Sequence, residues 1–123
     1  MPESVEKLEI WQRGVALVEE IYAMTRSWPR EEIYCLTGQL RRAAVSVPAN
    51  LAEGIGRGTT REAARYAQIA LGSLYELDTL FVIAARLGYL NEDEGVRLRE
   101  SVKRLCRQVS SFVAYQKGRD EGA

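Results

Sequence analysis

Residues 36–53, LTGQLRRAAVSVPANLAE, carry the clearest structural pattern in the chain. Both apolar and polar residues recur there every three or four positions, and at about 100° per helical residue they separate into two stripes. The apolar stripe consists of Leu36, Leu40, Val47 and Leu51. The polar stripe consists of Gln39, Arg42, Ser46, Asn50 and Glu53. Because the polar set mixes amides, a guanidinium, a hydroxyl and a carboxylate, we predict a helix with a second, hydrogen-bonded contact face.

The same three-and-four spacing continues through the rest of the chain, and no segment alternates as a strand would. We therefore predict an all-α protein, with helices over residues 5–25, 31–53, 60–87 and 92–117. Pro48 should kink the second helix, and the last six residues, GRDEGA, should fray. Helices of this length joined by short turns pack most simply as an antiparallel up-down-up-down four-helix bundle, here a single domain over residues 1–123.

Several residues mark where the predicted helices begin and end. Thr59 and Glu62 have the spacing of a capping box for the third helix, and Gly88 suits its C-terminal end. Asn91 is a typical N-cap for the fourth helix. The glycines of residues 54–58 are expected to form the turn between the second and third helices.

Three further stripes bear on packing and association. We expect the inner face of the first helix to be formed by Trp11, Val15, Val18, Tyr22 and Thr25. The third helix has one core stripe, formed by Ala63, Tyr66, Ala70, Leu74, Leu77 and Phe81. Its second apolar stripe is formed by Ile69, Leu80, Ile83 and Leu87. Gly72 and Ser73 lie between these two stripes, and Glu76 lies one turn further along as a polar residue. One bundle core cannot cover both, so we expect a homo-oligomer that uses this surface together with the polar stripe.

The composition sets limits on the class of protein. The chain has 123 residues, 46% hydrophobic and 28% charged, with a formal net charge of zero. We find no apolar run of the roughly 18 residues that a membrane span needs, and the N-terminus lacks the pattern of a signal peptide. We therefore expect a cytoplasmic protein without a membrane partner. Cys35 and Cys106 match neither a CxxC pattern nor a zinc spacing, so we expect reduced thiols.

The chain contains no histidine, which excludes Ser-His-Asp and Cys-His catalysis and histidine metal ligation. Glu53 and Glu76 could face each other as an acid and a base, but arginines near both favour structural ion pairs. The segment Gly54–Gly58 precedes a helix and could cradle a phosphate, yet it lacks the end of a P-loop and a preceding strand. An interhelical turn is the better interpretation. We expect no enzymatic activity, no cofactor, no metal and no small-molecule substrate.

Basic residues are unevenly distributed despite the neutral sum. Arg57, Arg61 and Arg65 would form a ridge if helical geometry continued through the glycine segment, and Arg99, Lys103 and Arg107 lie in a basic part of the fourth helix. An RNA backbone could use such surfaces, because phosphate contacts require charge rather than sequence readout. Solvated faces with weak local salt bridges are the alternative interpretation.

Motifs along the chain resemble those of a known family. They are Leu8-x-x-Trp11, then Leu36-x-x-Gln39-x-x-Arg42-Ala43-Ala44-x-Ser46-x-Pro48-x-Asn50-x-Ala52-Glu53-Gly54-x-x-Arg57, then Ala70-x-Gly72-Ser73-x-x-Glu76-Leu77-x-Thr79 and Leu87-Gly88-Tyr89-Leu90. This pattern resembles the 23S rRNA-intervening sequence proteins, also called S23 ribosomal proteins. The resemblance implies a four-helix bundle that forms a ring, typically a homopentamer, without enzymatic activity. From this resemblance we expect the ring to act as a scaffold or as an RNA-associated binding module.

Residue by residue, the resemblance assigns a structural or interfacial role to Arg42, Ser46, Asn50, Glu53, Arg57, Ser73 and Glu76. Whether Arg42 pairs with Glu76 within a subunit or between subunits stays open at this point. A related branch is the accessory variability determinant of diversity-generating retroelements, which binds a reverse transcriptase and nucleic acid. That branch looks strongly basic, whereas this chain is neutral, so a retroelement role is the alternative hypothesis.

Overall fold

The computed structural model describes residues 1–122, and the side chains of residues 1–120. All secondary structure within residues 1–122 is helical. The elements are α1 (Glu3–Glu6), α2 (Glu9–Thr25), the 3₁₀-helix η1 (Arg30–Glu32), α3 (Leu36–Gly56), α4 (Thr60–Arg86) and α5 (Glu92–Gly122). The prediction of an all-α protein with four long helices is confirmed.

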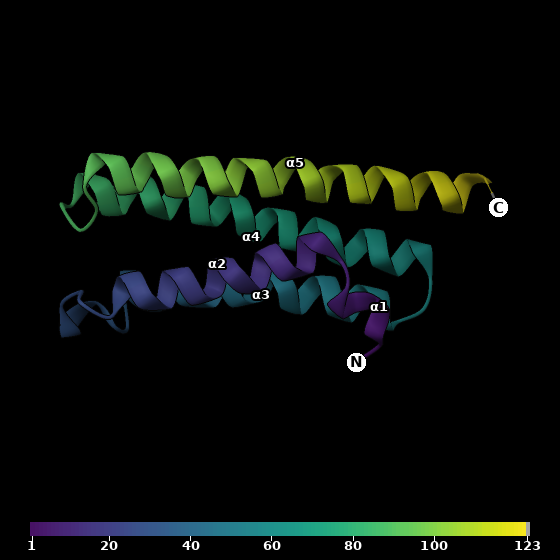
Figure 1. Ribbon diagram of the computed structural model, residues 1–123, viewed down its shortest axis with the longest axis horizontal. Helices are drawn as coiled ribbons and strands as arrows, with labels where there is room; N and C mark the ends of the chain where they lie inside the picture. The colour runs from purple at the N-terminus through teal and green to yellow at the C-terminus, as the bar shows by residue number, and fades with distance from the viewer. Residues whose placement is uncertain (123) are drawn as a thin grey trace.

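The four long helices run antiparallel, each reversing the direction of the one before (Figure 1). α4 lies between α3 and α5 and packs along both, while α2 packs mainly on α3 and meets α5 at few points. One of those points is the ion pair between Arg97 of α5 and Glu20 of α2. The N-terminus and the end of α5 lie at the same end of the bundle, as expected for four alternating helices.

The predicted helix ends around α4 and at the start of α5 are confirmed. The backbone N–H of Glu62 donates to Thr59 Oγ1 at 3.1 Å. Gly88 has φ of +86°, a left-handed conformation that glycine adopts without the penalty of a Cβ. The N–H of Glu94 donates to Asn91 Oδ1 at 2.8 Å, and the N–H of Asn91 donates back to Glu94 Oε1 at 3.3 Å. This reciprocal pair fixes where α5 begins.

Other helix boundaries differ from the prediction. The first helix is broken at Lys7–Leu8 into α1 and α2, and the second begins at Leu36 rather than residue 31. At its other end α3 continues to Gly56, so within residues 54–58 it is Gly58, with φ of +86°, that makes the turn. α5 runs on to Gly122, through residues predicted to fray; Ala123 lies outside the described residues.

Gly54 has a packing role instead of a turn role. A Cβ on Gly54 would lie 2.6 Å from the Cβ of Tyr66 and 2.9 Å from the carbonyl oxygen of Glu62. No side chain larger than hydrogen fits there, because the nearest atoms belong to the backbone and the stem of the next helix. Gly54 therefore sets how closely α3 approaches α4.

The core is formed by one buried stripe from each long helix. In α3 it includes Leu40, Val47 and Leu51, as predicted, and in α5 it includes Leu98, Val102 and Val109. The predicted inner face of the first helix was wrong. The buried residues of α2 are Ile10, Gly14, Leu17, Ile21 and Thr25. Thr25 was predicted correctly. The other four predicted residues each follow a buried one by one position, and they are half-buried or exposed.

α4 is long and apolar enough to cross a membrane, judged by length and composition alone. This differs from the expectation that no segment reaches that length. A core helix of a bundle passes the same test, and α4 packs between two other helices (Figure 1). In the most apolar 18-residue stretch of α4, only 39% of the residues are buried within the chain. Much of the apolar surface of α4 is therefore left uncovered by the subunit itself.

Candidate functional site

The predicted polar stripe and the uncovered side of α4 come together on one surface, the α3–α4 face. We define this face by the residues on the outer sides of the two helices. They are Gln39, Arg42, Val45, Ser46, Asn50 and Glu53 of α3, and Ile69, Gly72, Ser73, Glu76, Leu80, Ile83 and Leu87 of α4. It includes all eight residues predicted for an oligomer interface.

A short hydrogen-bonded chain lies at the centre of the α3–α4 face. Ser46 Oγ and Ser73 Oγ lie 2.8 Å apart and join the two helices. Asn50 Nδ2 donates to the Ser46 carbonyl and to Ser46 Oγ, each at 2.8 Å. Ser73 Oγ also lies 3.4 Å from the Ile69 carbonyl. Either hydroxyl can donate in the Ser46–Ser73 contact, since each serine oxygen can also accept, and the three half-buried side chains fix one another.

The charged residues of the face are exposed and only partly neutralised within the chain. Among residues 1–120, no ion pair joins Arg42 to Glu76, so the possibility of pairing within a subunit is not realised in this structure. Glu53 pairs with Arg57 at 3.3 Å, one helical turn away. Arg42 and Glu76 therefore remain available for a contact outside the subunit.

Apolar side chains flank this polar centre on both helices. Ile69, Ile83 and Val45 are exposed, Leu87 is 60% exposed, and Leu80 is buried at the helix junction. Near the start of α3, Tyr34, Leu36, Gln39, Ile83 and Leu87 are among the residues that line a hollow of about 340 Å³. No atom lies within 4 Å of the position of a Cβ on Gly72, so the middle of the face is open to a close approach by another molecule.

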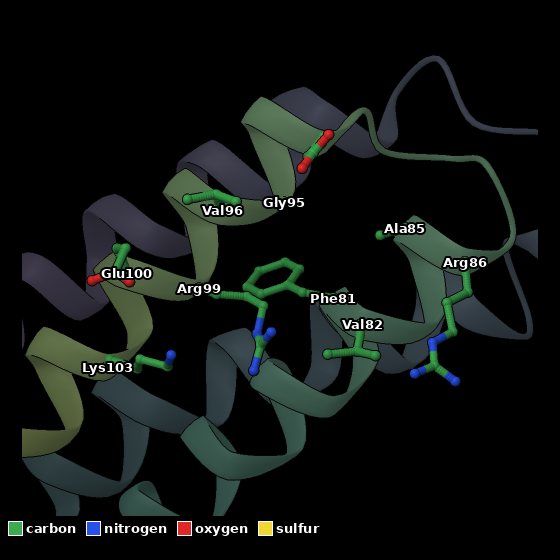
Figure 2. A pocket seen from close by; sticks show the side chains of 10 residues that line it. Phe81, Val82, Ala85, Arg86, Gly95, Val96, Arg99, Glu100 and Lys103 are labelled. Atoms are coloured by element: carbon green, nitrogen blue, oxygen red, sulfur yellow. The ribbon is translucent and has the colours of Figure 1, made fainter.

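A second hollow lies on the other side of α4, between the end of α4 and the start of α5 (Figure 2). It has a volume of about 490 Å³ and is lined by Phe81, Val82, Ala85, Arg86, Glu92, Gly95, Val96, Arg99, Glu100 and Lys103. We call it the α4–α5 groove. Figure 2 shows Val82 and Val96 on facing helices, with Phe81 between them. Val96 is 58% exposed, so the groove presents apolar surface ringed by both signs of charge.

The residues predicted to contact nucleic acid do not form one ridge. Gly58 interrupts the helical geometry between Arg57 and Arg61, so a continuous ridge through Arg65 is wrong. The guanidinium groups of Arg57 and Arg65 instead lie over the ring of Tyr66, at 4.8 and 5.2 Å from its centroid.

Half of these six basic residues pair with carboxylates in the chain. Arg57 pairs with Glu53, and Arg65 with Glu62. Arg99 donates through two nitrogens to Asp78, at 2.9 and 3.2 Å. Arg61 lines a shallow hollow with Lys117 and Asp120, Lys103 lines the α4–α5 groove, and Arg107 is exposed. This arrangement favours solvated faces over one concentrated basic surface.

Sequence reasoning missed part of the α3–α4 face. Tyr34, which is 90% exposed, and Val45 both extend its apolar area on the side of α3. Both could have been recognised as large apolar residues outside the core stripe. Val45 lies off that stripe within α3, and Tyr34 comes just before the helix begins. The α4–α5 groove was missed entirely, because it depends on where two helices diverge. Within residues 1–120, whose side chains the structure describes, no cluster of three or more His, Cys, Asp or Glu residues could hold a metal ion.

Comparisons with known proteins add a family and a fold. The model of the 23S rRNA-intervening sequence protein family matches residues 6–111. A crystal structure of a protein of unknown function from the S23 ribosomal protein family of Bacteroides thetaiotaomicron is similar, with a TM-score of 0.75 and 14% sequence identity. The similarity covers 85% of this chain and 97% of that one, and at this identity it shows the fold alone. No curated protein matches the chain.

Proposed function

Because the chain belongs to the family of 23S rRNA-intervening sequence proteins, we propose that it is a non-enzymatic subunit of a homo-oligomeric ring. The ring has five subunits and acts in the cytoplasm as a scaffold or an RNA-associated binding module. The observation that carries the proposal is the α3–α4 face, where a fixed polar centre is surrounded by apolar side chains that the subunit leaves exposed.

The chemistry of this face favours a protein contact over a solvated surface. The Ser46–Ser73 contact and the Asn50 amide hold the centre in one conformation, so a partner would meet an ordered surface. Exposed Ile69, Ile83 and Leu87 supply apolar area, and covering such area favours association at about 25 cal/mol per Å² before the costs of binding. Contiguous apolar surface next to ordered polar groups is typical of an interaction site.

A closed ring of five needs two different patches on each subunit, since five-fold symmetry cannot be built from contacts of one patch with itself. We propose the α4–α5 groove as the second patch. The groove is concave, whereas the α3–α4 face carries exposed apolar side chains. Val82 and Val96 supply apolar surface in the groove (Figure 2). Its charged rim also offers Glu92 and Glu100 to an arginine such as Arg42.

Native mass spectrometry of variants tests the ring. Ser73→Lys places a long charged chain in the centre of the α3–α4 face, and Val96→Lys does the same in the α4–α5 groove; each should give monomers. Mixing the two variants should give dimers, because each retains the patch that the other has lost. Ala23→Lys, at an exposed position of α2, is the matched control and should leave the ring intact. A five-membered ring formed by both single variants would overturn the assignment of the patches.

The partner is tested on protein purified without nuclease at near-physiological ionic strength. A ring that carries extra mass, removed by ribonuclease, supports RNA association, and the bound RNA can be sequenced. A ring without that mass supports the scaffold role with a protein partner. A wild-type monomer at micromolar concentration would contradict the whole proposal.

A further inference from the structure

A pocket at the end of the α2–α3 hairpin gathers positive charge without a carboxylate in its lining. Its volume is about 240 Å³, and its lining consists of Thr25, Arg26, Trp28, Pro29, Arg30, Ile33, Thr37 and Arg41. Among residues 1–120, its three arginines form no ion pair. The neighbouring Glu32 is directed elsewhere, since its carboxylate accepts a hydrogen bond from Tyr89 at 3.2 Å.

Arg41 is already held in place for a ligand. Its Nε donates to Thr25 Oγ1 at 2.9 Å, and its guanidinium carbon lies 4.5 Å from the centroid of the Tyr22 ring. Thr25 is itself fixed, because its hydroxyl donates to the Ile21 carbonyl at 2.7 Å. The two terminal nitrogens of Arg41 have no hydrogen bond among the described residues. They form the pair of parallel donors that binds two oxygens of a phosphate.

A buried hydroxyl without a partner is an independent sign of a missing ligand. Thr37 is 3% exposed and lines the pocket, and its Oγ1 has no hydrogen-bond partner among the side chains and backbone that the structure describes. Buried hydroxyls are nearly always paired, so an unpaired one calls for an acceptor that the chain does not supply. Thr37 lies in the first turn of α3, whose N-cap residue, Cys35, makes no capping hydrogen bond. The first turn of a 21-residue helix therefore borders the pocket, and its positive end also favours an anion.

We propose that this pocket binds a phosphoryl group, held by Arg26, Arg30 and Arg41 with the Thr37 hydroxyl as a further donor. Its volume is below the roughly 300 Å³ at which sites for drug-sized molecules begin, so it suits a small anionic group. The phosphoryl group is either a phosphate monoester or free phosphate, or a phosphodiester of an RNA backbone. The site does not depend on the ring, because Thr37 and Arg41 face α2, away from Ser46 and Asn50.

Tryptophan fluorescence reports on this site, since one of the two tryptophans lines it. In Trp11→Phe the remaining emission comes from Trp28, and in Trp28→Phe it comes from Trp11 in the first turn of α2, which does not line the pocket. The probes are inorganic phosphate, a 5′-phosphorylated hexauridylate and the same oligomer with a 5′-hydroxyl, all at constant ionic strength. We expect a saturable change in Trp11→Phe and none in Trp28→Phe.

Substitutions identify the groups that bind. Arg30 is exposed and unpaired, so Arg30→Gln should leave the fold intact and weaken phosphate binding by roughly tenfold or more, as for a lost charge-assisted hydrogen bond. Thr37→Val keeps the shape and should weaken binding by a smaller factor. Arg104→Gln removes an exposed arginine of α5 and is the matched control, expected to bind normally.

The three probes separate the two sources of phosphate. A response to inorganic phosphate and to the 5′-phosphorylated oligomer alone assigns the site to a monoester or free phosphate. An equal response to the 5′-hydroxyl oligomer assigns it to internal phosphodiesters. Absence of a saturable response to every probe would overturn the proposal, as would equal weakening by Arg30→Gln and Arg104→Gln. A failure here leaves the ring proposal untouched, since mass spectrometry measures that separately.

Discussion

The two sides of α3 differ in how far the subunit completes them. On the inner side, Leu40, Val47 and Leu51 are fully buried against the rest of the core. On the outer side, Ser46 and Asn50 are hydrogen-bonded but Arg42 is left without an ion pair in residues 1–120. The inner side stabilises the fold of the subunit, and the outer side remains available to bind a partner. Stability and association should therefore respond to different substitutions on the same helix.

The largest effect is expected on the inner side. Leu51→Ala removes a side chain that is 1% exposed and leaves a cavity, which should lower the free energy of unfolding by about 2–5 kcal/mol. Val45→Ala, on the exposed side of the same helix, should change it by no more than about 0.5 kcal/mol. Urea denaturation at a fixed protein concentration measures both. Equal losses would mean that the two sides of α3 do not differ in the way described.

A second test concerns the contact that brings α3 against α4. Gly54→Ala should cost about 1–3 kcal/mol, because its Cβ would lie 2.6 Å from Tyr66 Cβ with no flexible atom to move aside. Gly56→Ala, two residues further along α3, meets no atom within 4 Å and should be neutral or slightly stabilising. Thermal unfolding of the two variants side by side makes the comparison. A stabilised Gly54→Ala would show that α3 and α4 can separate without cost.

Features of the fold that depend on residues close together in the sequence could be predicted, whereas features that depend on packing between distant segments could not. The two stripes of α3 follow from helical periodicity within one segment, and the caps at Thr59 and Asn91 from side-chain chemistry within four residues. The inner face of α2 was misplaced because two apolar stripes, one position apart, both have helical spacing. Packing decided between them: a Cβ on Gly14 would lie 3.4 Å from Pro48, so the small residue marks the side that meets α3.

The candidate sites divide in the same way. The polar centre of the α3–α4 face was predictable, since all its α3 members lie on one stripe. The pairing of Ser46 with Ser73 was not, because it depends on the register of two helices. The arginine pocket was not visible either, since Arg26 follows the end of α2 while Arg41 lies in α3, and the two meet only through the hairpin. Gly58 similarly decided that Arg57 and Arg61 do not continue one ridge.

A smaller effect, confined to association, is expected from the outer side of α3. Arg42→Glu should weaken the oligomer roughly tenfold or more without changing subunit stability, because Arg42 has no carboxylate partner among residues 1–120 of its own chain. If the α3–α4 face meets the α4–α5 groove, adding Glu100→Arg should restore part of the affinity. Adding Glu76→Arg should not. Sedimentation equilibrium measures the three variants, and rescue by Glu76→Arg alone would indicate two-fold dimers in place of a ring.

The smallest effect is a difference in thiol reactivity that reports on the same uncovered surface. Cys35 is exposed beside the hollow that Gln39 and Leu87 line, whereas Cys106 is half-buried, and burial raises the pKa of its thiol. The nucleophile is the thiolate, so at pH 8 iodoacetamide should modify Cys35 well before Cys106, and raising the pH should narrow the gap. If the ring covers the α3–α4 face, Cys35 should react faster in monomeric Ser73→Lys than in the wild type, while Cys106 keeps its rate. Equal Cys35 rates in the two proteins would place this end of α3 outside the contact, and would confine the interface to the serine centre and the residues that follow it.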